Sequence, residues 1–124
     1  MTTEQRDLTP SRTEVRDEHH TWWMELDGDG LTAVDSGGAL AHVDVREDDD
    51  RVHLVFWLDD RLPGTVGTEL TRRLFEHPAL RHQRPVAASL PHRGVDVLTE
   101  LRRHLAGATT HVAGATCLVV GRVR

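Results

Sequence analysis

Short runs of alternating apolar and polar residues fill the first half of the chain. The first run covers residues 20–26, and further runs follow at 31–35, 39–46 and 52–58. Alternation with a period of two is typical of strands that bury one face. Because only short turns separate the four runs, the pattern predicts an antiparallel β-meander.

The turn between the first two runs carries a local signal of its own. It reads Asp27-Gly28-Asp29-Gly30, and Asp-Gly is a strong signal for a tight hairpin. The same letters open a calcium-binding loop, but Leu31 and Ala33 stand where such a loop requires oxygen ligands. The sequence therefore favours a hairpin turn over a metal site.

The run at 52–58 differs from the others because it is apolar on both faces. Val52, Leu54 and Phe56 lie on one face, and Val55 and Trp57 lie on the other. A strand of this kind is typical of the middle of a sheet. We therefore expect residues 52–58 to be buried on both sides.

The periodicity changes after the turn at residues 59–68. Apolar residues then recur at helical spacing up to Pro78, which predicts a helix ending near Glu76 and His77. The residues expected on its buried face are Val66, Leu70, Leu74 and Phe75.

The remainder of the chain predicts a strand, a helix and one or two further strands. The strand is Pro85–Pro91, bounded by two prolines, and the helix is expected over Val95–Leu105, with Gly107 as its stop. Gly114 is expected to form a turn before a last strand at Thr116–Val123.

These elements predict an α+β fold. An antiparallel β-meander is followed by helix, strand, helix and strand, and a helix between two strands favours local parallel pairing. We therefore expect a mixed sheet with helices packed on it. Residues 1–18 are expected to form a flexible tail with a short helix near Ser11–Asp17, and residues 19–124 a single α+β domain.

Composition narrows the possible functions. The chain has 124 residues and a formal charge of −5, which argues against general nucleic-acid binding. All 15 cationic residues are arginines, so lysine-based chemistry is excluded, and the chain has no tyrosine. Cys117 is its single cysteine, which excludes an intrachain disulfide and a two-cysteine zinc site.

The sequence predicts a cytoplasmic protein. No apolar run has the length of a membrane span, and the N-terminus lacks the apolar core of a signal peptide. The nine histidines do not follow the spacing of a zinc helix, so no metal site is expected.

The turn at residues 59–68 carries the most specific chemical signal. It links the expected central strand to a helix and contains Gly64 and Gly67. Backbone N–H groups at the start of a helix lack partners within the helix, and the helix dipole favours negative charge there. A phosphate group would fit this position.

The element order and this turn resemble the second half of the GNAT N-acetyltransferases. Arg61-Leu62-Pro63-Gly64 is similar to the start of that family's Gln/Arg-x-x-Gly-x-Gly/Ala motif. Val66 stands where the family has Gly or Ala, and Gly67 comes one residue late. The resemblance implies an acyl-CoA-dependent N-acyltransferase with acetyl-CoA as cofactor and a small-molecule or protein amine as acceptor. The cofactor-binding residues it implies are Trp57, Leu58, Arg61, Gly64, Thr65, Val66, Gly67 and Thr68.

The resemblance also implies where the rest of the cofactor would lie. In the family, the acyl-pantetheine arm enters between two splayed strands, which here would place it beside residues 56–58 and 87–89. Many members use a tyrosine on the last helix as proton donor, and the aligned region here, Leu101–His104, offers arginine and histidine instead. The family's helices that build the acceptor site have no counterpart, because only residues 27–30 lie there.

Three residues are candidates for catalysis. His53 on the central strand could act as base, with His42 on its neighbour as a weaker candidate, because histidine titrates near neutral pH. Ser89 could orient the thiol or the substrate. Each residue also has a purely structural interpretation, and no Gly-x-Ser-x-Gly elbow indicates a serine hydrolase.

Two functional hypotheses remain open. The chain is either a GNAT-like N-acyltransferase or a non-catalytic α+β module that binds a ligand or a protein partner. Unpaired sheet edges and exposed tryptophan would suit a homodimer in both cases.

Overall fold

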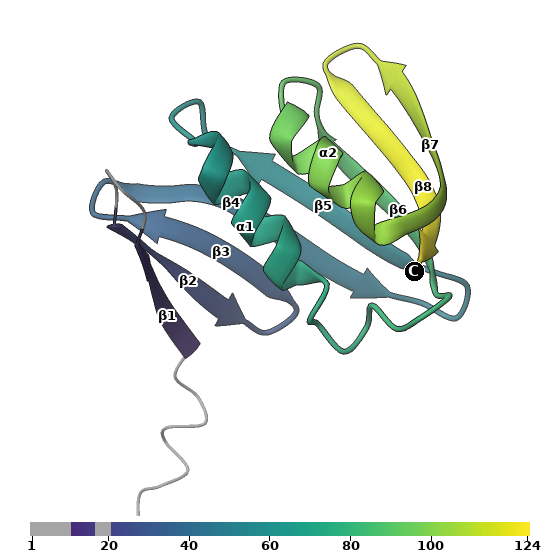
Figure 1. The fold of residues 1–124 in the computed structure, drawn as a ribbon, viewed down its shortest axis with the longest axis horizontal. Coiled ribbons are helices and arrows are strands. Elements are labelled where there is room, and N and C mark those ends of the chain that lie inside the picture. Colours follow the sequence, from purple (N-terminus) through teal and green to yellow (C-terminus); the bar gives the residue numbers. More distant parts are fainter. Residues whose placement is uncertain (1–10, 17–20) are drawn as a thin grey trace, which may run out of the picture.

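The computed structural model describes residues 11–16 and 21–124. Within these residues the chain forms eight strands and two helices (Figure 1). In chain order they are β1 (Ser11–Arg16), β2 (Thr21–Asp27), β3 (Gly30–Asp35), β4 (Gly38–Glu47), β5 (Val52–Leu58), α1 (Gly64–Leu74), β6 (Pro85–Pro91), α2 (Val95–His104), β7 (Leu105–Ala113) and β8 (Thr116–Val123).

The strands form one mixed sheet in the order β1-β2-β3-β4-β5-β6-β8-β7. Among the described strands, β5 and β6 are the one parallel pair, and every other neighbouring pair is antiparallel. The sheet therefore consists of two antiparallel blocks, β1–β5 and β6-β8-β7, joined along β5 and β6. The α+β class, the meander and the parallel pairing across α1 agree with the sequence-based prediction.

Local turn signals predicted two hairpins correctly. Asp27 pairs with Gly30, and Gly28 between them has a φ angle of 57°, which suits glycine. Gly114 turns the chain between β7 and β8 with a φ angle of 61°. The strand predicted between the two prolines is found with the same bounds as β6.

Both helices pack on the same face of the sheet (Figure 1). Val66, Leu70 and Leu74 of α1 and Val97 and Leu101 of α2 are buried at this layer. They contact the inward residues of the strands in a single apolar core. The spacing of these residues is helical, so the amphipathic pattern explains the position of both helices.

No described helix covers the opposite face of the sheet, which corrects the expectation for β5. Its inward residues Val52 and Leu54 are fully buried, but Val55 and Trp57 are each 49% exposed. The strand lies centrally, as predicted, yet only one of its faces is covered because both helices lie on the other side. Apolar residues on both faces therefore indicated central position but not two-sided burial.

The short helix expected near Ser11–Asp17 is wrong. Residues 11–16 form β1, which pairs antiparallel with β2 from Ser11 opposite Leu26 to Arg16 opposite Thr21. Strand pairing is made by backbone groups, so a polar segment can extend a sheet edge without apolar side chains. The rest of the predicted tail, residues 1–10 and 17–18, lies outside the described residues.

The end of α2 also differs from the prediction. The helix ends at His104, and β7 begins directly at Leu105. Gly107, expected to stop the helix, instead has a φ angle of 64° within a register shift of β7 against β8. Strand β8 lies between β6 and β7, so α2 does not link neighbouring parallel strands as α1 does.

Neither described helix has the length and the continuous apolar surface needed to cross a membrane.

Candidate ligand-binding crevice

Strands β5 and β6 are paired along only part of their length. Pairing runs from Val52 with Val86 to Val55 with Ser89, whereas β5 continues to Leu58 and β6 to Pro91. Backbone pairing between the two strands therefore ends at Val55, before either strand does. In sheets with parallel strands, ligands commonly bind outside the carboxyl ends.

A hollow of about 120 Å³ lies at these carboxyl ends. Three segments supply its walls: the end of β5 with the turn that follows, the start of α1, and the turn from β6 into α2. The residues lining it are Leu58, Asp59, Asp60, Leu62, Gly64, Arg93, Gly94, Val95, Asp96 and Val97. We call this hollow the crevice. A shallow groove along the first turns of α1 shares Gly64 and Asp96 with it, so the two are continuous.

Arg93 connects the two separated strands across the crevice. Its Nη2 donates a hydrogen bond of 2.5 Å to the carbonyl oxygen of Leu58 and lies 3.2 Å from a carboxylate oxygen of Asp60. Arg93 comes from the turn after β6, whereas both partners belong to the end of β5 and its turn. The side chain thus joins the two edges where backbone pairing has ended.

The floor of the crevice is closely packed. A Cβ placed on Gly94 would lie 2.6 Å from Cδ1 of Leu58 and 3.3 Å from the carbonyl oxygen of Pro91. The absence of a side chain at residue 94 therefore lets the start of α2 approach the end of β5. This contact limits the depth of the crevice.

The start of α1 offers fewer free backbone donors than the sequence suggested. The helix begins at Gly64, and the N–H groups of Val66 and Gly67 both bond to the carbonyl oxygen of Pro63 at 3.1 Å. Within the expected set of donors from Gly64 to Thr68, the N–H groups of Val66 and Gly67 therefore already have partners. The first two N–H groups of the helix are those of Gly64 and Thr65, because α1 starts at Gly64 and not after Gly67.

Asp96 lies directly beside this helix start. A Cβ on Gly64 would be 2.6 Å from Oδ2 of Asp96, so the carboxylate is in close contact with the backbone there. Asp96 belongs to the first turn of α2, and its negative charge suits the positive ends of both helices. A bound phosphate would compete with this carboxylate for the same position.

Arg61 is held by contacts within the fold. Its Nε donates to Oδ1 of Asp59 at 3.0 Å, and its Nη2 donates to the carbonyl oxygen of Ala39 at 3.3 Å. Its Nη1 also lies 3.8 Å from Oδ1 of Asp35, the last residue of β3. The guanidinium therefore attaches the turn before α1 to the neighbouring hairpin.

The carboxyl group of Asp59 has a lowered pKa. The first cause is the hydrogen bond from the backbone N–H of Arg61, followed by the side chain of Arg61 and the charge of Arg93. Asp59 thus stays ionised at the mouth of the crevice and keeps Arg61 in place.

The other residues predicted to bind the cofactor divide into two groups. Leu58 lines the crevice, and Thr65 and Thr68 line the groove that continues from it. Val66 is fully buried in the core. Gly67 is buried where the helices meet, because a Cβ there would lie 3.2 Å from Cγ2 of Val97. Neither Val66 nor Gly67 therefore lines the crevice.

Trp57 and Ser89 belong to the open face of the sheet. Trp57 lies opposite His42 on β4, and His42 forms a 2.6 Å hydrogen bond with Thr32. Ser89 is the last residue of β6 that pairs with β5. The segment 87–89, expected to border an inserted arm, is instead paired with β5, and the separation begins beyond it.

His53 lies away from the crevice. It is at the start of β5, about 17 Å from Leu58 for five residues of extended chain. Its Nε2 is 3.0 Å from Oδ2 of Asp48, and its side chain is 45% exposed. The structure therefore does not bring His53 together with Leu58, Gly64 or Arg93.

The C-terminal end of α2 is also distant from the crevice, because the crevice is lined by the N-terminal end of that helix. His104 stacks on Phe75 at 4.4 Å between ring centroids, and its Nε2 lies 2.9 Å from Oε2 of Glu100. Glu100 is 5% exposed and also approaches Nε of Arg72 at 3.8 Å. The segment Leu101–His104 thus includes part of the contact between the helices and offers no proton donor at the crevice.

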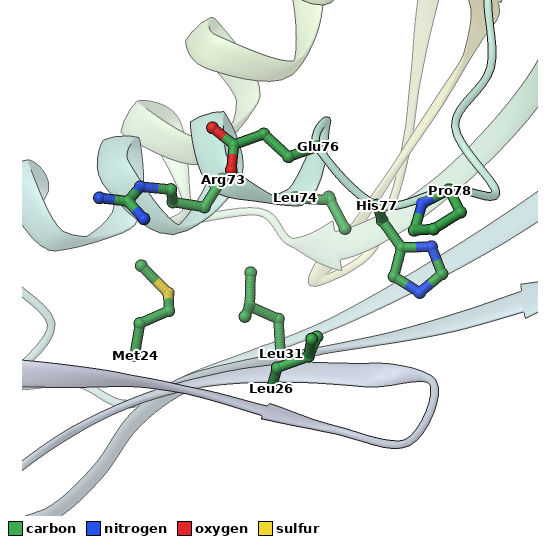
Figure 2. A pocket seen from close by; sticks show the side chains of 8 residues that line it. All are labelled: Met24, Leu26, Leu31, Arg73, Leu74, Glu76, His77 and Pro78. Atoms are coloured by element: carbon green, nitrogen blue, oxygen red, sulfur yellow. The ribbon is translucent and has the colours of Figure 1, made fainter. Parts of the chain in front are cut away.

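A second pocket of about 250 Å³ lies at the opposite end of α1 (Figure 2). Met24, Leu26 and Leu31 rise from β2 and β3 toward Leu74, and Arg73, Glu76 and His77 stand around them (Figure 2). The length of α1, about 16 Å, separates this pocket from the crevice. It is mainly apolar and lacks the free strand ends of the crevice.

Sequence reasoning missed Arg93, Gly94 and Asp96. Their signal was present, because Pro91-His92-Arg93-Gly94 leads from a strand into a helix as the turn after β5 does. Two parallel neighbouring strands place such turns at the same edge of the sheet. Across the described residues, no group of three His, Cys, Asp or Glu side chains is placed to hold a metal ion.

Comparison with known proteins gives limited similarity. No protein-family model matches the chain, and no curated protein matches its sequence. Among solved structures, it is similar to one described as a "putative acetyltransferase" from Sphaerobacter thermophilus, with 16% identity and a TM-score of 0.48. The match covers 77% of this chain and 68% of the other. No assignment of function follows from similarity at this level.

Proposed function

We propose that the chain binds acyl-coenzyme A in the crevice and transfers the acyl group to an amine, as a small GNAT-like N-acyltransferase. One observation carries the proposal: the parallel pairing of β5 and β6 covers four residue pairs and ends before the start of α1. Separated strands expose backbone groups that an extended pantetheine arm can pair with, and a helix start favours a phosphate.

The reaction would proceed by direct transfer. The amine nitrogen forms a bond to the thioester carbonyl carbon, the carbon–sulfur bond breaks, and the amine proton ends on the coenzyme A thiolate. Ser89 lies where the strands begin to separate and remains the candidate that orients the sulfur. Asp59 and Asp60 at the mouth would attract a cationic amine.

A non-catalytic module is the second candidate, and two contacts favour it. Asp96 places a carboxylate beside Gly64, and Arg93 crosses between the separated strands. Both contacts occupy positions that a bound cofactor would use. A module of this kind would bind a ligand in the crevice without transferring an acyl group.

Binding of acetyl-CoA tests the proposal first. We expect the melting temperature to rise with acetyl-CoA, because a ligand that binds the folded state stabilises it by mass action. Release of free thiol from acetyl-CoA with a panel of amines then separates the two candidates. Binding of acetyl-CoA with release of thiol supports the acyltransferase. Binding of acetyl-CoA supports the module if no amine of the panel causes thiol release. An unchanged melting temperature at millimolar acetyl-CoA would contradict both an acyltransferase and a module that binds this cofactor.

Thr65→Glu locates the site. Thr65 is exposed in the first turn of α1, so a glutamate there should stabilise the helix while repelling the pyrophosphate. We expect acetyl-CoA binding to weaken at least about tenfold, which corresponds to the loss of one charge-assisted contact. Thr99→Glu, at an exposed position of α2, is the matched control and should bind as the unmodified chain does.

A further inference from the structure

We propose that Arg93 is a latch on the crevice that exchanges partners when the ligand binds. In the structure, its guanidinium occupies the hydrogen-bond position of an inserted ligand at Leu58. On binding, it would release Leu58 and pair with the phosphate of the ligand. This inference rests on the proposed function and identifies the residue that controls access to the site.

The Leu58 carbonyl is directed into the gap between the strands. The N–H of Asp59 donates to the carbonyl oxygen of Leu40 on the β4 side, at 2.9 Å. In a trans peptide unit the N–H and C=O groups point in opposite directions, so the carbonyl of Leu58 points toward the β6 side. Backbone pairing with β6 has ended three residues earlier, at Val55. Arg93 supplies the donor that a paired strand would have supplied.

An extended ligand in the gap would require this same acceptor. The pantetheine arm contains two amides, and each N–H must find an acceptor when it leaves water. The Leu58 carbonyl has a hydrogen-bond position that Arg93 now fills at 2.5 Å. A carbonyl oxygen can accept two hydrogen bonds, so the competition is for the space beside Leu58 that the guanidinium now occupies, and a ligand lying there displaces it.

The released guanidinium has a nearby partner available. Arg93 and Gly64 line the same crevice, so the side chain remains next to the start of α1. Its side chain is 56% exposed, and its ion partner Asp60 is 91% exposed, so that ion pair contributes little to holding it. A pyrophosphate at the helix start offers a stronger, charge-assisted contact. The exchange of partners thus frees the Leu58 carbonyl for the ligand and at the same time brings the guanidinium of Arg93 to the phosphate.

The test uses two probes that differ in their phosphates. S-acetylpantetheine has the arm alone, whereas acetyl-CoA has the arm and the pyrophosphate. Dissociation constants are measured by calorimetry for the unmodified chain, for Arg93→Met and for Arg81→Met. Arg81 is an exposed arginine whose Nη2 bonds to Glu47 at 2.8 Å, and it does not line the crevice, which makes it a matched control.

Opposite changes in affinity are expected. Arg93→Met should bind S-acetylpantetheine about fivefold more tightly, because one competing hydrogen bond is removed. It should bind acetyl-CoA about tenfold more weakly, because the phosphate loses a cationic partner. Arg81→Met should change neither constant. Melting curves of all three proteins confirm that the variants are folded.

The outcomes separate the latch from the proposed function. If the unmodified chain binds acetyl-CoA but Arg93→Met shifts both dissociation constants in the same direction, or shifts neither, the partner exchange of Arg93 is wrong, whereas the proposed binding of acyl-coenzyme A stands. If neither the unmodified chain nor Arg93→Met binds either probe, both are wrong.

Discussion

Asp96 sets the electrostatics of the candidate site. Its carboxylate lies beside Gly64, where the starts of α1 and α2 meet. Two helix starts in one place produce a positive field, and the carboxylate compensates for it. Asp59 and Asp60 add further negative charge to the same crevice, with Arg93 as the one cation among the described residues that line it, which distinguishes it from an open phosphate-binding loop.

Asp96→Asn should therefore strengthen phosphate binding. The variant keeps the shape of the side chain and removes its charge, so we expect acetyl-CoA to bind about two- to fivefold more tightly. Calorimetric titration measures the change, with Asp49→Asn in the exposed turn between β4 and β5 as control. Equal or weaker binding by Asp96→Asn would show that the carboxylate does not compete with the ligand.

Gly94 is required by packing and not by its backbone angle. Its φ angle of −81° is accessible to any residue, but a Cβ would overlap Leu58 and approach Pro91. We expect Gly94→Ala to lower the free energy of unfolding by about 1–3 kcal/mol, as overpacking does in a closed core. Urea denaturation measures the loss.

Gly37→Ala is the matched control for Gly94→Ala. A Cβ there would lie 2.8 Å from Nη1 of Arg61, which is the end of a flexible, partly exposed side chain. The guanidinium can move, so stability should change little. Equal losses in the two variants would contradict the packing argument.

At the scale of elements, the turn between β4 and β5 depends on one ionised carboxylate. Oδ1 of Asp48 accepts hydrogen bonds from the N–H groups of Asp50 and Arg51, each at 2.8 Å, and Oδ2 contacts His53. The hydrogen bond from the backbone N–H of Arg51 is the main cause of a lowered pKa for Asp48, followed by the backbone N–H of Asp50 and the side chain of His53.

This lowered pKa predicts acid sensitivity. The unfolded chain binds a proton at Asp48 more readily than the folded chain, so the contribution is complete above the ordinary pKa of 3.8 and is lost as pH falls through the lower, folded value. We expect Asp48→Asn to reduce the loss of stability between neutral pH and about pH 3, measured by urea denaturation at each pH. Asp49→Asn, whose side chain accepts none of these hydrogen bonds, should keep the full loss.

Element order could be predicted from the sequence because its signals are local. Alternation marked β2 to β5, two prolines bounded β6, and Asp-Gly marked the hairpin after β2. β1 had no such signal, because a polar edge strand is held by backbone hydrogen bonds to its neighbour. The direct passage from α2 into β7 at Leu105 likewise lacked a stop residue.

The site could be predicted only in part, for a related reason. The sequence indicated Leu58, Gly64 and Thr65 because these lining residues lie in one continuous segment, from the end of β5 to the first turn of α1. Arg93 and Asp96 come from a distant turn, and their role depends on parallel pairing of β5 with β6. The pairing was expected, but its length was not, because nothing local in the sequence indicates where two strands separate.

At the scale of the whole molecule, the sheet has one covered and one open face. Trp57 is 49% exposed on the open face, whereas Trp22 is 1% exposed in the core. The homodimer expected from the sequence would have this face and the sheet edges available.

Fluorescence quenching tests whether the face is open. We expect acrylamide to quench Trp57 readily in dilute solution. Trp57→Phe should remove the larger part of the quenchable emission and leave that of the partly exposed Trp23, because Trp22 is shielded. Trp22→Phe is the control and should leave the quenchable emission in place. Loss of quenching as protein concentration rises would place a second copy on this face, and inaccessible Trp57 at all concentrations would contradict an open face.

The short junction between β5 and β6 has a mechanical consequence. Seven residue pairs join β4 to β5 and seven join β6 to β8, but only four join β5 to β6. A force that pulls the two blocks apart would concentrate on this seam, with the contact of α1 and α2 through Glu100 as reinforcement. A molecule bound between the ends of β5 and β6 would add contacts across the strand pair that has the fewest backbone pairs in the described sheet. Resistance to pulling in a single-molecule experiment would then report ligand occupancy directly.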